Sequence, residues 1–290
     1  MSMNIQWFPG HMAKTGRLIQ ENLKLIDIVC EIADARIPYS SRNPYLDSLI
    51  SSKPRLIILN KADIADESIT DEWIRYYDKK GIRTLTADSK NSRVFTSFSK
   101  TVREILEDEL KRRADRGMSG KSIRVMVTGV PNVGKSTFIN NLSGKASAKT
   151  GDRPGVTTGK QWIKIQGGIE LLDTPGMLWQ KFENPRQGMN LAFTGAIKDT
   201  VVDLEELSVH LLNFLRDNYT ENLCQRYKLS DIKDLEGYEI LVMIGKKRGF
   251  LMSGGDTDTE RTASILIDEF RGAKLGRISL ERPDTMQTNN

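Results

Sequence analysis

The stretch GVPNVGKS, residues 129–136, decides the fold of this 290-residue chain. It matches G-x-x-x-x-G-K-[ST], the pattern of a loop that wraps phosphate groups. The apolar run IRVMVT precedes it and STFINNLS follows, so we expect the loop between a buried strand and a helix. Glycines are needed where backbone N–H groups turn toward the phosphates and a Cβ would clash. A glycine-rich turn without a ligand is the alternative, and the flanking strand and helix disfavour it.

The residues of this loop have distinct expected roles. Lys135 should reach the β- and γ-phosphates, and the Ser136 hydroxyl should ligate Mg²⁺. Downstream, LLDTPG ends an apolar strand, which makes Asp173 the candidate for the carboxylate that faces Mg²⁺. Gly176 can offer its N–H to the γ-phosphate. A DTPG alone also makes a good turn, but its position after a phosphate loop favours the nucleotide role.

Between these two motifs lies TGDRPGVTTGK, residues 150–160, which is rich in Gly, Pro and Thr. That composition is typical of a mobile loop that becomes ordered when a nucleotide binds. Thr157 could order on the γ-phosphate and Mg²⁺, and Thr158 is the neighbouring alternative. A plain surface loop is the other interpretation of this segment.

A second motif concerns the base. NKAD, residues 60–63, follows the apolar run RLIILN, at the carboxyl end of a predicted strand, where open α/β sheets bind ligands. The Asp63 carboxylate can accept from both N1–H and the exocyclic amine of guanine, whereas adenine would leave it unpaired at a cost of about 1–3 kcal/mol. This argues against an ATPase. Asn60 can bond the guanine edge and tie loops together, and the stem of Lys61 can lie along the base. In isolation, NKAD is also a simple turn after a strand.

The next strand ends in TADS, residues 86–89, where Thr86 and Ala87 are candidates for a second contact with the base. Short β-branched runs alternate with helical stretches from residue 26 to residue 173, which predicts an α/β fold with a mostly parallel sheet. The expected strands are 26–35, 55–60, 82–87 and 123–129, and the expected helices are 68–81 and 93–117. A Gly-Gly turn predicts a hairpin over residues 161–173.

The pattern changes near residue 200. Leucines at helical spacing over residues 203–219 and two later helical stretches predict a smaller, all-helical C-terminal domain. We therefore expect a nucleotide-binding domain over residues 1–200, a helical domain over residues 201–282 and a tail over residues 283–290.

Composition sets the broad class. Apolar residues make up 38% of the chain and charged residues 28%, and the longest apolar runs fall far short of the roughly 18 residues that span a bilayer. The N-terminus has no signal-peptide pattern, so we expect a cytoplasmic protein without a membrane partner. Two cysteines are too few for a disulfide framework, and Cys30 in an apolar run is expected to be a buried thiol. The net charge of +5 permits a nucleic-acid partner without demanding one.

The order of the motifs is rotated. In ordinary small GTPases the phosphate loop comes first, then the switch threonine, DxxG, NKxD and the S-A element. Here NKAD and TADS precede GVPNVGKS, PGVTTG and DTPG, so the chain resembles a circularly permuted GTPase with a P-loop GTPase fold. With IQWFPGHMAK (5–14), DARIPYSSRNP (34–44) and the helical C-terminal region, it closely resembles the ribosome biogenesis GTPase A (YlqF-type) family over nearly its whole length.

This resemblance implies an enzyme that hydrolyses GTP to GDP and phosphate during late maturation of the large ribosomal subunit. It implies binding to the subunit precursor and its rRNA, hydrolysis stimulated by the particle, and a monomer off the ribosome. A GTP-dependent recruitment switch, whose main role is to bind a non-ribosomal partner, is the alternative.

The motifs that match the family supply the candidate nucleotide contacts, which are Asn60, Lys61, Ala62, Asp63, Thr86, Ala87, Asn132, Val133, Gly134, Lys135, Ser136, Thr137 and Gly176. The candidate Mg²⁺ ligands are Ser136, Thr157 and Asp173. Asn132 resembles the phosphate-loop asparagine of potassium-stimulated GTPases, which implies K⁺ as a second cation.

Water activation needs a separate residue. The residue after DTPG is Met177, which cannot orient water as the usual glutamine does. The resemblance therefore implies that His11 is catalytic, beside Lys135 and Thr157; a turn histidine that contacts RNA or nothing is the alternative. His210, in an amphipathic helix, is expected to be structural. Two basic clusters are candidates for RNA contact, with a solvated helix face as the alternative: Lys246, Lys247 and Arg248, and Arg271, Lys274 and Arg277.

Overall fold

The structure is a computed structural model that describes residues 11–50, 53–88, 94–144, 161–179, 182 and 184–284, with only the backbone of residues 11–15. The described residues form two compact units. We call residues 11–179 with 279–284 the sheet unit, and residues 182–278 the helical unit. In the part of the chain that is described, no helix combines the length and the apolar character needed to cross a membrane.

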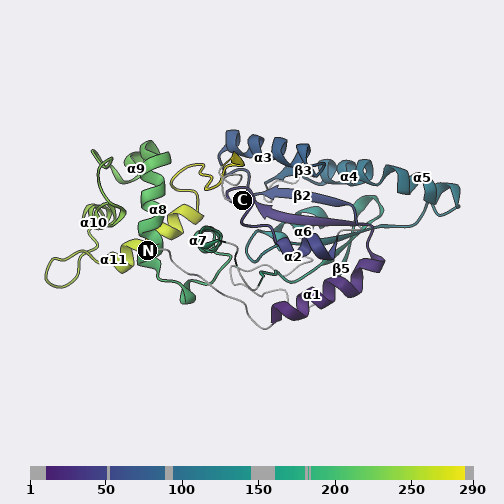
Figure 1. Cartoon of the computed structure of the whole chain (residues 1–290), viewed down its shortest axis with the longest axis horizontal. Helices are drawn as coiled ribbons and strands as arrows, with labels where there is room; N and C mark the ends of the chain where they lie inside the picture. Colours follow the sequence, from purple (N-terminus) through teal and green to yellow (C-terminus); the bar gives the residue numbers. More distant parts are fainter. Residues whose placement is uncertain are drawn as a thin grey trace. The chain divides into compact units, whose positions relative to one another are not determined.

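The sheet unit is built on one six-stranded sheet (Figure 1). Its strands are β1 (Ile28–Asp34), β2 (Arg55–Asn60), β3 (Arg83–Ala87), β4 (Ile123–Thr128), β5 (Gln161–Ile165) and β6 (Ile169–Asp173). The order is β3-β2-β1-β4-β6-β5, and every neighbouring pair is parallel except β5 and β6. The mostly parallel α/β sheet and the antiparallel hairpin at 161–173 are therefore confirmed.

Helices connect these strands. They are α1 (His11–Asn22), α2 (Pro44–Leu49), α3 (Glu67–Lys79), α4 (Val94–Ile105), α5 (Glu107–Asp115) and α6 (Lys135–Ser143), with short 3-10 turns η1 (Leu23–Leu25) and η2 (Gln166–Gly168). The sequence pattern predicted a single helix over residues 93–117; the structure has two, because Leu106 departs from helical geometry between α4 and α5.

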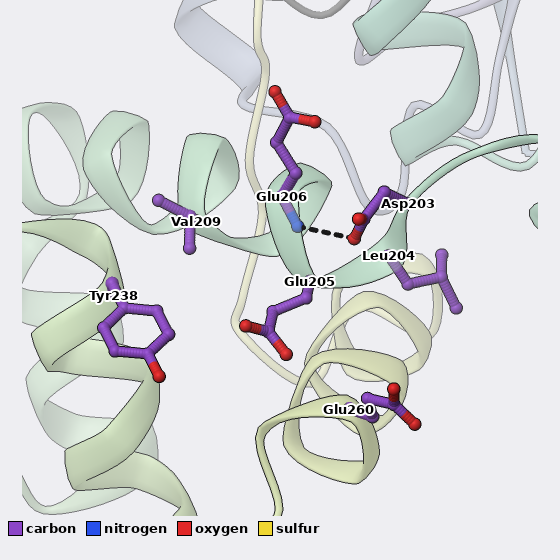
Figure 2. Close-up of a pocket in the computed structure, with 7 residues that line it drawn as sticks. All are labelled: Asp203, Leu204, Glu205, Glu206, Val209, Tyr238 and Glu260. Atoms are coloured by element: carbon purple, nitrogen blue, oxygen red, sulfur yellow. Dashed lines mark hydrogen bonds between the residues drawn. The ribbon is translucent and has the colours of Figure 1, made fainter. Parts of the chain in front are cut away.

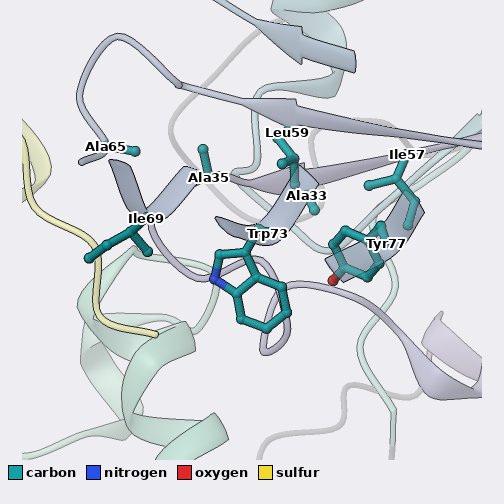
Figure 3. Close-up of a cluster of buried hydrophobic side chains, with 8 residues drawn as sticks. All are labelled: Ala33, Ala35, Ile57, Leu59, Ala65, Ile69, Trp73 and Tyr77. Atoms are coloured by element: carbon teal, nitrogen blue, oxygen red, sulfur yellow. The ribbon is translucent and has the colours of Figure 1, made fainter. Parts of the chain in front are cut away.

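Helix α3 covers one face of the sheet (Figure 3). Trp73 and Tyr77 of α3 pack on Ile57 and Leu59, which point to the same side of β2 because alternate residues of a strand share a face. Ile58, between them, is equally buried, so the other face is covered as well. Helices α4 and α6 pack together through Phe98 and Phe138, whose ring centroids are 5.7 Å apart. Helix α4 also contacts β3, and α6 contacts β5 and β6.

The buried strands also account for the burial and the raised pKa of the Cys30 thiol. It lies in β1, where all seven residues are buried, and burial raises its pKa well above the ordinary range, with Glu31 adding to the effect. The prediction of a buried thiol at this position is confirmed.

The helical unit consists of α7 (Pro185–Phe193), the 3-10 turn η3 (Asp199–Val201), α8 (Leu204–Asn218), α9 (Thr220–Tyr227), α10 (Gly237–Arg248) and α11 (Thr259–Arg271). Leu207, Leu211 and Leu215, which lie at helical spacing in α8, are buried, and α8 packs against α10 and α11. Helix α10 approaches the next segment so closely that a Cβ on Gly245 would lie 2.3 Å from Thr257 Cγ2. A helical C-terminal region is thus confirmed.

The chain returns to the sheet unit after Ile278. Ser279, Leu280 and Glu281 are each no more than 2% exposed and are held by residues near the ends of β1 and β2. This return has no signature in the local sequence, where we placed the end of the helical domain at residue 282. The domain boundaries at residues 200 and 282 stay predictions.

Candidate functional site

Strand register brings the sequence motifs to one edge of the sheet. Asp34 pairs with Asn60, and Asn60 with Ala87, so the ends of β1, β2 and β3 lie level. On the other side of β1, Val127 pairs with Asp173. The carboxyl edge of the parallel strands therefore carries NKAD, TADS, the phosphate loop and DTPG together, although they are spread over more than a hundred residues of sequence.

The phosphate loop runs from β4 into α6, as its sequence predicts. Gly129 has φ +153°, and a Cβ there would lie 2.4 Å from the carbonyl oxygen of Ile32 in the neighbouring strand, so only glycine fits. Gly134, the N-cap residue just before α6, has φ 92°, in the left-handed region. Asn132 also has a left-handed backbone (φ 58°), which asparagine tolerates better than most residues. The loop therefore has the turns that direct N–H groups inward.

DTPG packs directly against this loop. A Cβ on Gly176 would lie 3.0 Å from Pro131 N and 3.3 Å from Lys135 Nζ, so the glycine backbone touches the phosphate loop. The Thr174 hydroxyl donates to the Val127 carbonyl at 2.8 Å, which fixes the turn after Asp173 to the neighbouring strand. Gly176 and the lysine that should reach the phosphates are thus adjacent.

Lys135 and Asp173 are both almost fully buried, at 7% and 1% exposure. Burial lowers the pKa of Lys135, and the charge of nearby Asp173 opposes that effect. A buried ammonium beside a carboxylate is suited to receive further negative charge, as a phosphate would supply. Ser136 follows in the first turn of α6, half-buried, whereas Thr137 is exposed.

The NKAD loop is tied to the phosphate loop by its first two side chains. Asn60 Nδ2 donates to the Val133 carbonyl at 2.7 Å. Lys61 Nζ donates to the Asn132 carbonyl at 2.9 Å. The predicted tie between loops by Asn60 is therefore present, and Lys61 adds a second.

The rest of the edge, where a base is expected to bind, is more open. The Ala62 N–H donates to the Ala87 carbonyl at 3.2 Å, which joins NKAD to TADS. Asp63 and Thr86 are exposed, and Ala87 is buried. An exposed carboxylate at the rim, above a fixed loop, is accessible to a base.

Asp34 is a member of this edge that the sequence analysis did not assign. Its carboxylate accepts from Lys61 Nζ at 2.9 Å and from the Arg36 guanidinium at 2.9 and 2.8 Å. Burial by itself raises the pKa of Asp34, but Arg36 and Lys61 outweigh it and hold the pKa well below its ordinary range. The available signal was an Asp at the end of a buried strand, inside the quoted DARIPYSSRNP.

Asn43 is the second unassigned residue. Its amide donates to the Met177 carbonyl at 3.2 Å, while its side-chain oxygen accepts from the Tyr45 N–H and caps α2. Met177 itself is 2% exposed. The residue after DTPG is therefore buried and held by its backbone, which agrees with the view that it does not orient water.

Some predicted site residues lie outside the described part of the chain. These are Thr157, with its alternative Thr158, and the side chain of His11, whose backbone begins α1.

The candidate RNA clusters of the helical unit have unequal surroundings. Arg271 donates to the carbonyls of Phe193 and Ala192 at 3.0 and 2.7 Å and pairs with Asp199, so it joins α11 to α7. Arg248 pairs with Glu269 at 3.2 Å. These two arginines therefore have structural partners.

The remaining cations of the two clusters, Lys246, Lys247, Lys274 and Arg277, are exposed, as is Arg248, and Lys247 Nζ donates to the Lys228 carbonyl. Away from them, His210 Nε2 in α8 lies 3.9 Å from Glu206 Oε1. The structural role of His210 stays a prediction.

The phosphate loop packs against DTPG, and NKAD is hydrogen-bonded to the same loop. Together with the rotated order of these motifs along the chain, this arrangement defines a circularly permuted GTPase. Comparison with known proteins then identifies its family. The family model described as "50S ribosome-binding GTPase" matches residues 124–245. The chain is 47% identical over 283 residues to Ribosome biogenesis GTPase A of Bacillus pumilus, covering 98% of this chain and 100% of that protein. It is 32% identical over 280 residues to Ribosome biogenesis GTPase A of Thermotoga maritima, covering 97% and 95%.

Among solved structures, GNP-bound YlqF from T. maritima superposes with a TM-score of 0.65 at 29% identity and covers 93% of this chain and 99% of that one. The chain therefore belongs to the ribosome biogenesis GTPase A family.

Proposed function

We propose that this protein binds and hydrolyses GTP, and that it acts in late maturation of the large ribosomal subunit in the cytoplasm. The observation that carries the first part is the pair of bonds from Asn60 and Lys61 to the phosphate-loop carbonyls. They join the loop expected to read the base to the loop expected to hold the phosphates. A guanine nucleotide can then be held at both ends by one rigid edge.

The ligand chemistry supports Mg²⁺ with the nucleotide. Ser136 offers a hydroxyl and Asp173 a carboxylate, and both are the hard oxygen donors that Mg²⁺ prefers. The described residues contain no group of three or more His, Cys, Asp or Glu side chains that could hold a metal, so phosphate oxygens would complete the coordination. Bound there, Mg²⁺ would neutralise charge that develops on the phosphates. Thr157 as a further ligand, and K⁺ at Asn132, belong to the same proposal.

The family supports the ribosomal part. The matched family model carries the description "50S ribosome-binding GTPase", and the relatives are named for ribosome biogenesis. We propose that the protein, a monomer off the ribosome, binds the large-subunit precursor through rRNA, and that the particle stimulates hydrolysis. The exposed cations at Lys246, Lys247, Lys274 and Arg277 are the phosphate contacts we propose.

One groove of the helical unit is unsuited to RNA because carboxylates line it. Figure 2 shows a groove among α8, α10 and α11 whose lining includes Asp203, Glu205, Glu206 and Glu260. Asp203 caps α8 by accepting from the Glu206 N–H at 3.0 Å. Four carboxylates repel phosphates, so RNA contact should be confined to the basic clusters.

Sedimentation with large-subunit precursors tests the ribosomal function. We expect the protein to co-sediment with the particles in the presence of a non-hydrolysable GTP analogue and much less with GDP. The adenine analogue should give no more binding than GDP, because Asp63 rejects the base. If association with the particles does not depend on the guanine nucleotide, the assembly role is wrong, and the recruitment switch for a non-ribosomal partner becomes the better interpretation.

We propose further that His11 activates water, because the buried Met177 cannot. The change His11→Ala should lower particle-stimulated hydrolysis by roughly 100-fold or more and leave GDP affinity unchanged. The chain's other histidine provides the control: His210→Ala should hydrolyse GTP at the unmodified rate. Normal particle-stimulated hydrolysis by the His11 variant would remove this residue from the mechanism.

A further inference from the structure

The end of the helical unit is followed by a buried segment, residues 279–281, that we call the terminal strap. Its backbone and side chains bind two loops of the sheet unit. The Leu280 N–H donates to the Arg36 carbonyl at 2.8 Å. The Glu281 carboxylate accepts from the Tyr39 N–H at 2.8 Å, from the Ser40 N–H at 3.1 Å, and from the Ser40 hydroxyl. The strap therefore fixes the loop that follows β1.

The strap also holds the far end of the NKAD loop. The Ser279 hydroxyl accepts from the Asp66 N–H at 3.1 Å, and Asp66 is the residue that caps α3. The Glu281 carbonyl accepts from Trp73 Nε1 at 3.0 Å, at the middle of the same helix. A segment more than two hundred residues away in sequence thus fastens the exit of the loop that should read guanine.

The loop after β1 carries the connection to the entrance of NKAD. Arg36, whose carbonyl the strap binds, forms two bonds to Asp34 through its guanidinium. Asp34 accepts from Lys61 Nζ, which also donates to the Asn132 carbonyl of the phosphate loop. Lys61 has a left-handed backbone with φ 61°, a conformation that a lysine keeps only where its surroundings enforce it.

We propose that the terminal strap, acting through Arg36 and Asp34, positions the NKAD loop for guanine recognition. Asp34 and Glu281 are then positioning residues: neither has to touch the nucleotide. The strap holds the entrance of the loop through Lys61 and its exit through Asp66, so Asp63 between them is presented at a fixed place. This inference rests on the proposed binding of guanine nucleotide at NKAD.

The reason for such a device is the exposure of Asp63. Its carboxylate lies at the rim rather than in a packed interior, so its own neighbours do not fix it. Accurate hydrogen bonding to two guanine groups needs a fixed loop, and the bonds at both ends of NKAD provide it.

The test uses the full chain with Glu281→Gln, which preserves size but removes the charge that accepts three donors. We expect GDP to dissociate roughly three- to tenfold faster, the effect of weakening hydrogen bonds to a charged group. The preference for GDP over inosine diphosphate, which lacks the exocyclic amine, should fall as well. A general loss of stability would not change that ratio well below the melting temperature.

Asp284→Asn is the matched control, since it removes an exposed carboxylate three residues further along the chain. If the Glu281 variant releases GDP at the control's rate and keeps the same base preference, the strap does not position the loop. Should that variant fail to fold, Ser279→Ala is tested by the same two measurements, because it removes the hydroxyl that accepts from the Asp66 N–H. Failure of the unmodified protein to bind GDP would instead overturn the proposed function.

A double variant tests the route. If the strap acts through Asp34, then Glu281→Gln added to Asp34→Asn should release GDP no faster than Asp34→Asn alone. If the increase in the GDP release rate of the double variant equals the product of the increases of the two single variants, the strap acts independently of Asp34 and the proposed path is wrong.

Discussion

Replacing Lys135 by methionine should lower GTP hydrolysis by about 100- to 1,000-fold, the usual cost of removing one fixed positive donor from developing charge. Methionine retains most of the buried stem, so no large cavity forms at this 7% exposed position. The lost ammonium lies beside Asp173 and against Gly176, where we expect the γ-phosphate. Affinity for GTP should fall as well, because the carboxylate then repels the nucleotide. Single-turnover hydrolysis and titration with a fluorescent GTP analogue measure the two effects.

Lys121→Met is the matched control, since Lys121 is exposed two residues before β4. The control should hydrolyse GTP at the unmodified rate and unfold at the same temperature. Unchanged hydrolysis by the Lys135 variant would show that the phosphates are not bound by the 129–136 loop.

Replacing Asp63 by asparagine should reverse the choice of base. The asparagine amide presents a donor where the carboxylate accepted from the exocyclic amine of guanine, so GDP affinity should fall by about 100-fold or more. Xanthosine diphosphate has an oxygen at that place, and the same amide can donate to it. The variant should therefore bind xanthosine diphosphate more tightly than GDP. Calorimetric titration of the variant with each nucleotide measures the two affinities.

Asp71→Asn makes the same chemical change at an exposed position of α3, and it should leave both affinities unchanged. A preference for GDP that persists in the Asp63 variant would mean that another residue reads the base. Because Asp63 is exposed, its replacement should leave the folded structure intact, so lost affinity can be attributed to recognition.

The nucleotide motifs were predictable because each is a local pattern. A buried parallel strand is nearly continuous in apolar residues, and the loop after such a strand is where a ligand binds. The apolar runs that form β2 and β4 therefore predicted that NKAD and the phosphate loop are binding loops. Gly129 could be expected to be essential from its motif. The structure adds the reason, because any Cβ at this position would lie 2.4 Å from the Ile32 carbonyl oxygen. The hairpin of β5 and β6 followed from the Gly-Gly turn in the same way.

Other elements had weaker local signals. Helix α7 lies in the helical unit, although its sequence preceded the change of pattern that we placed at residue 200. The basic clusters of the helical unit looked uniform in sequence, but Arg271 is bound to α7 carbonyls and Arg248 to Glu269. Formal charge does not show which cations already have partners, because those partners come from other helices.

By itself, the sequence determined the order of the motifs, the alternation of strands and helices, and the identity of the residues at each strand end. These depend on neighbours within a few positions, where side-chain spacing dictates burial. Tertiary structure alone decided that Asp34 would meet Lys61 and that Glu281 would bind the Tyr39 and Ser40 N–H groups. Such bonds join segments up to 242 residues apart, and they form only where the packed sheet brings both partners out of water in compatible positions.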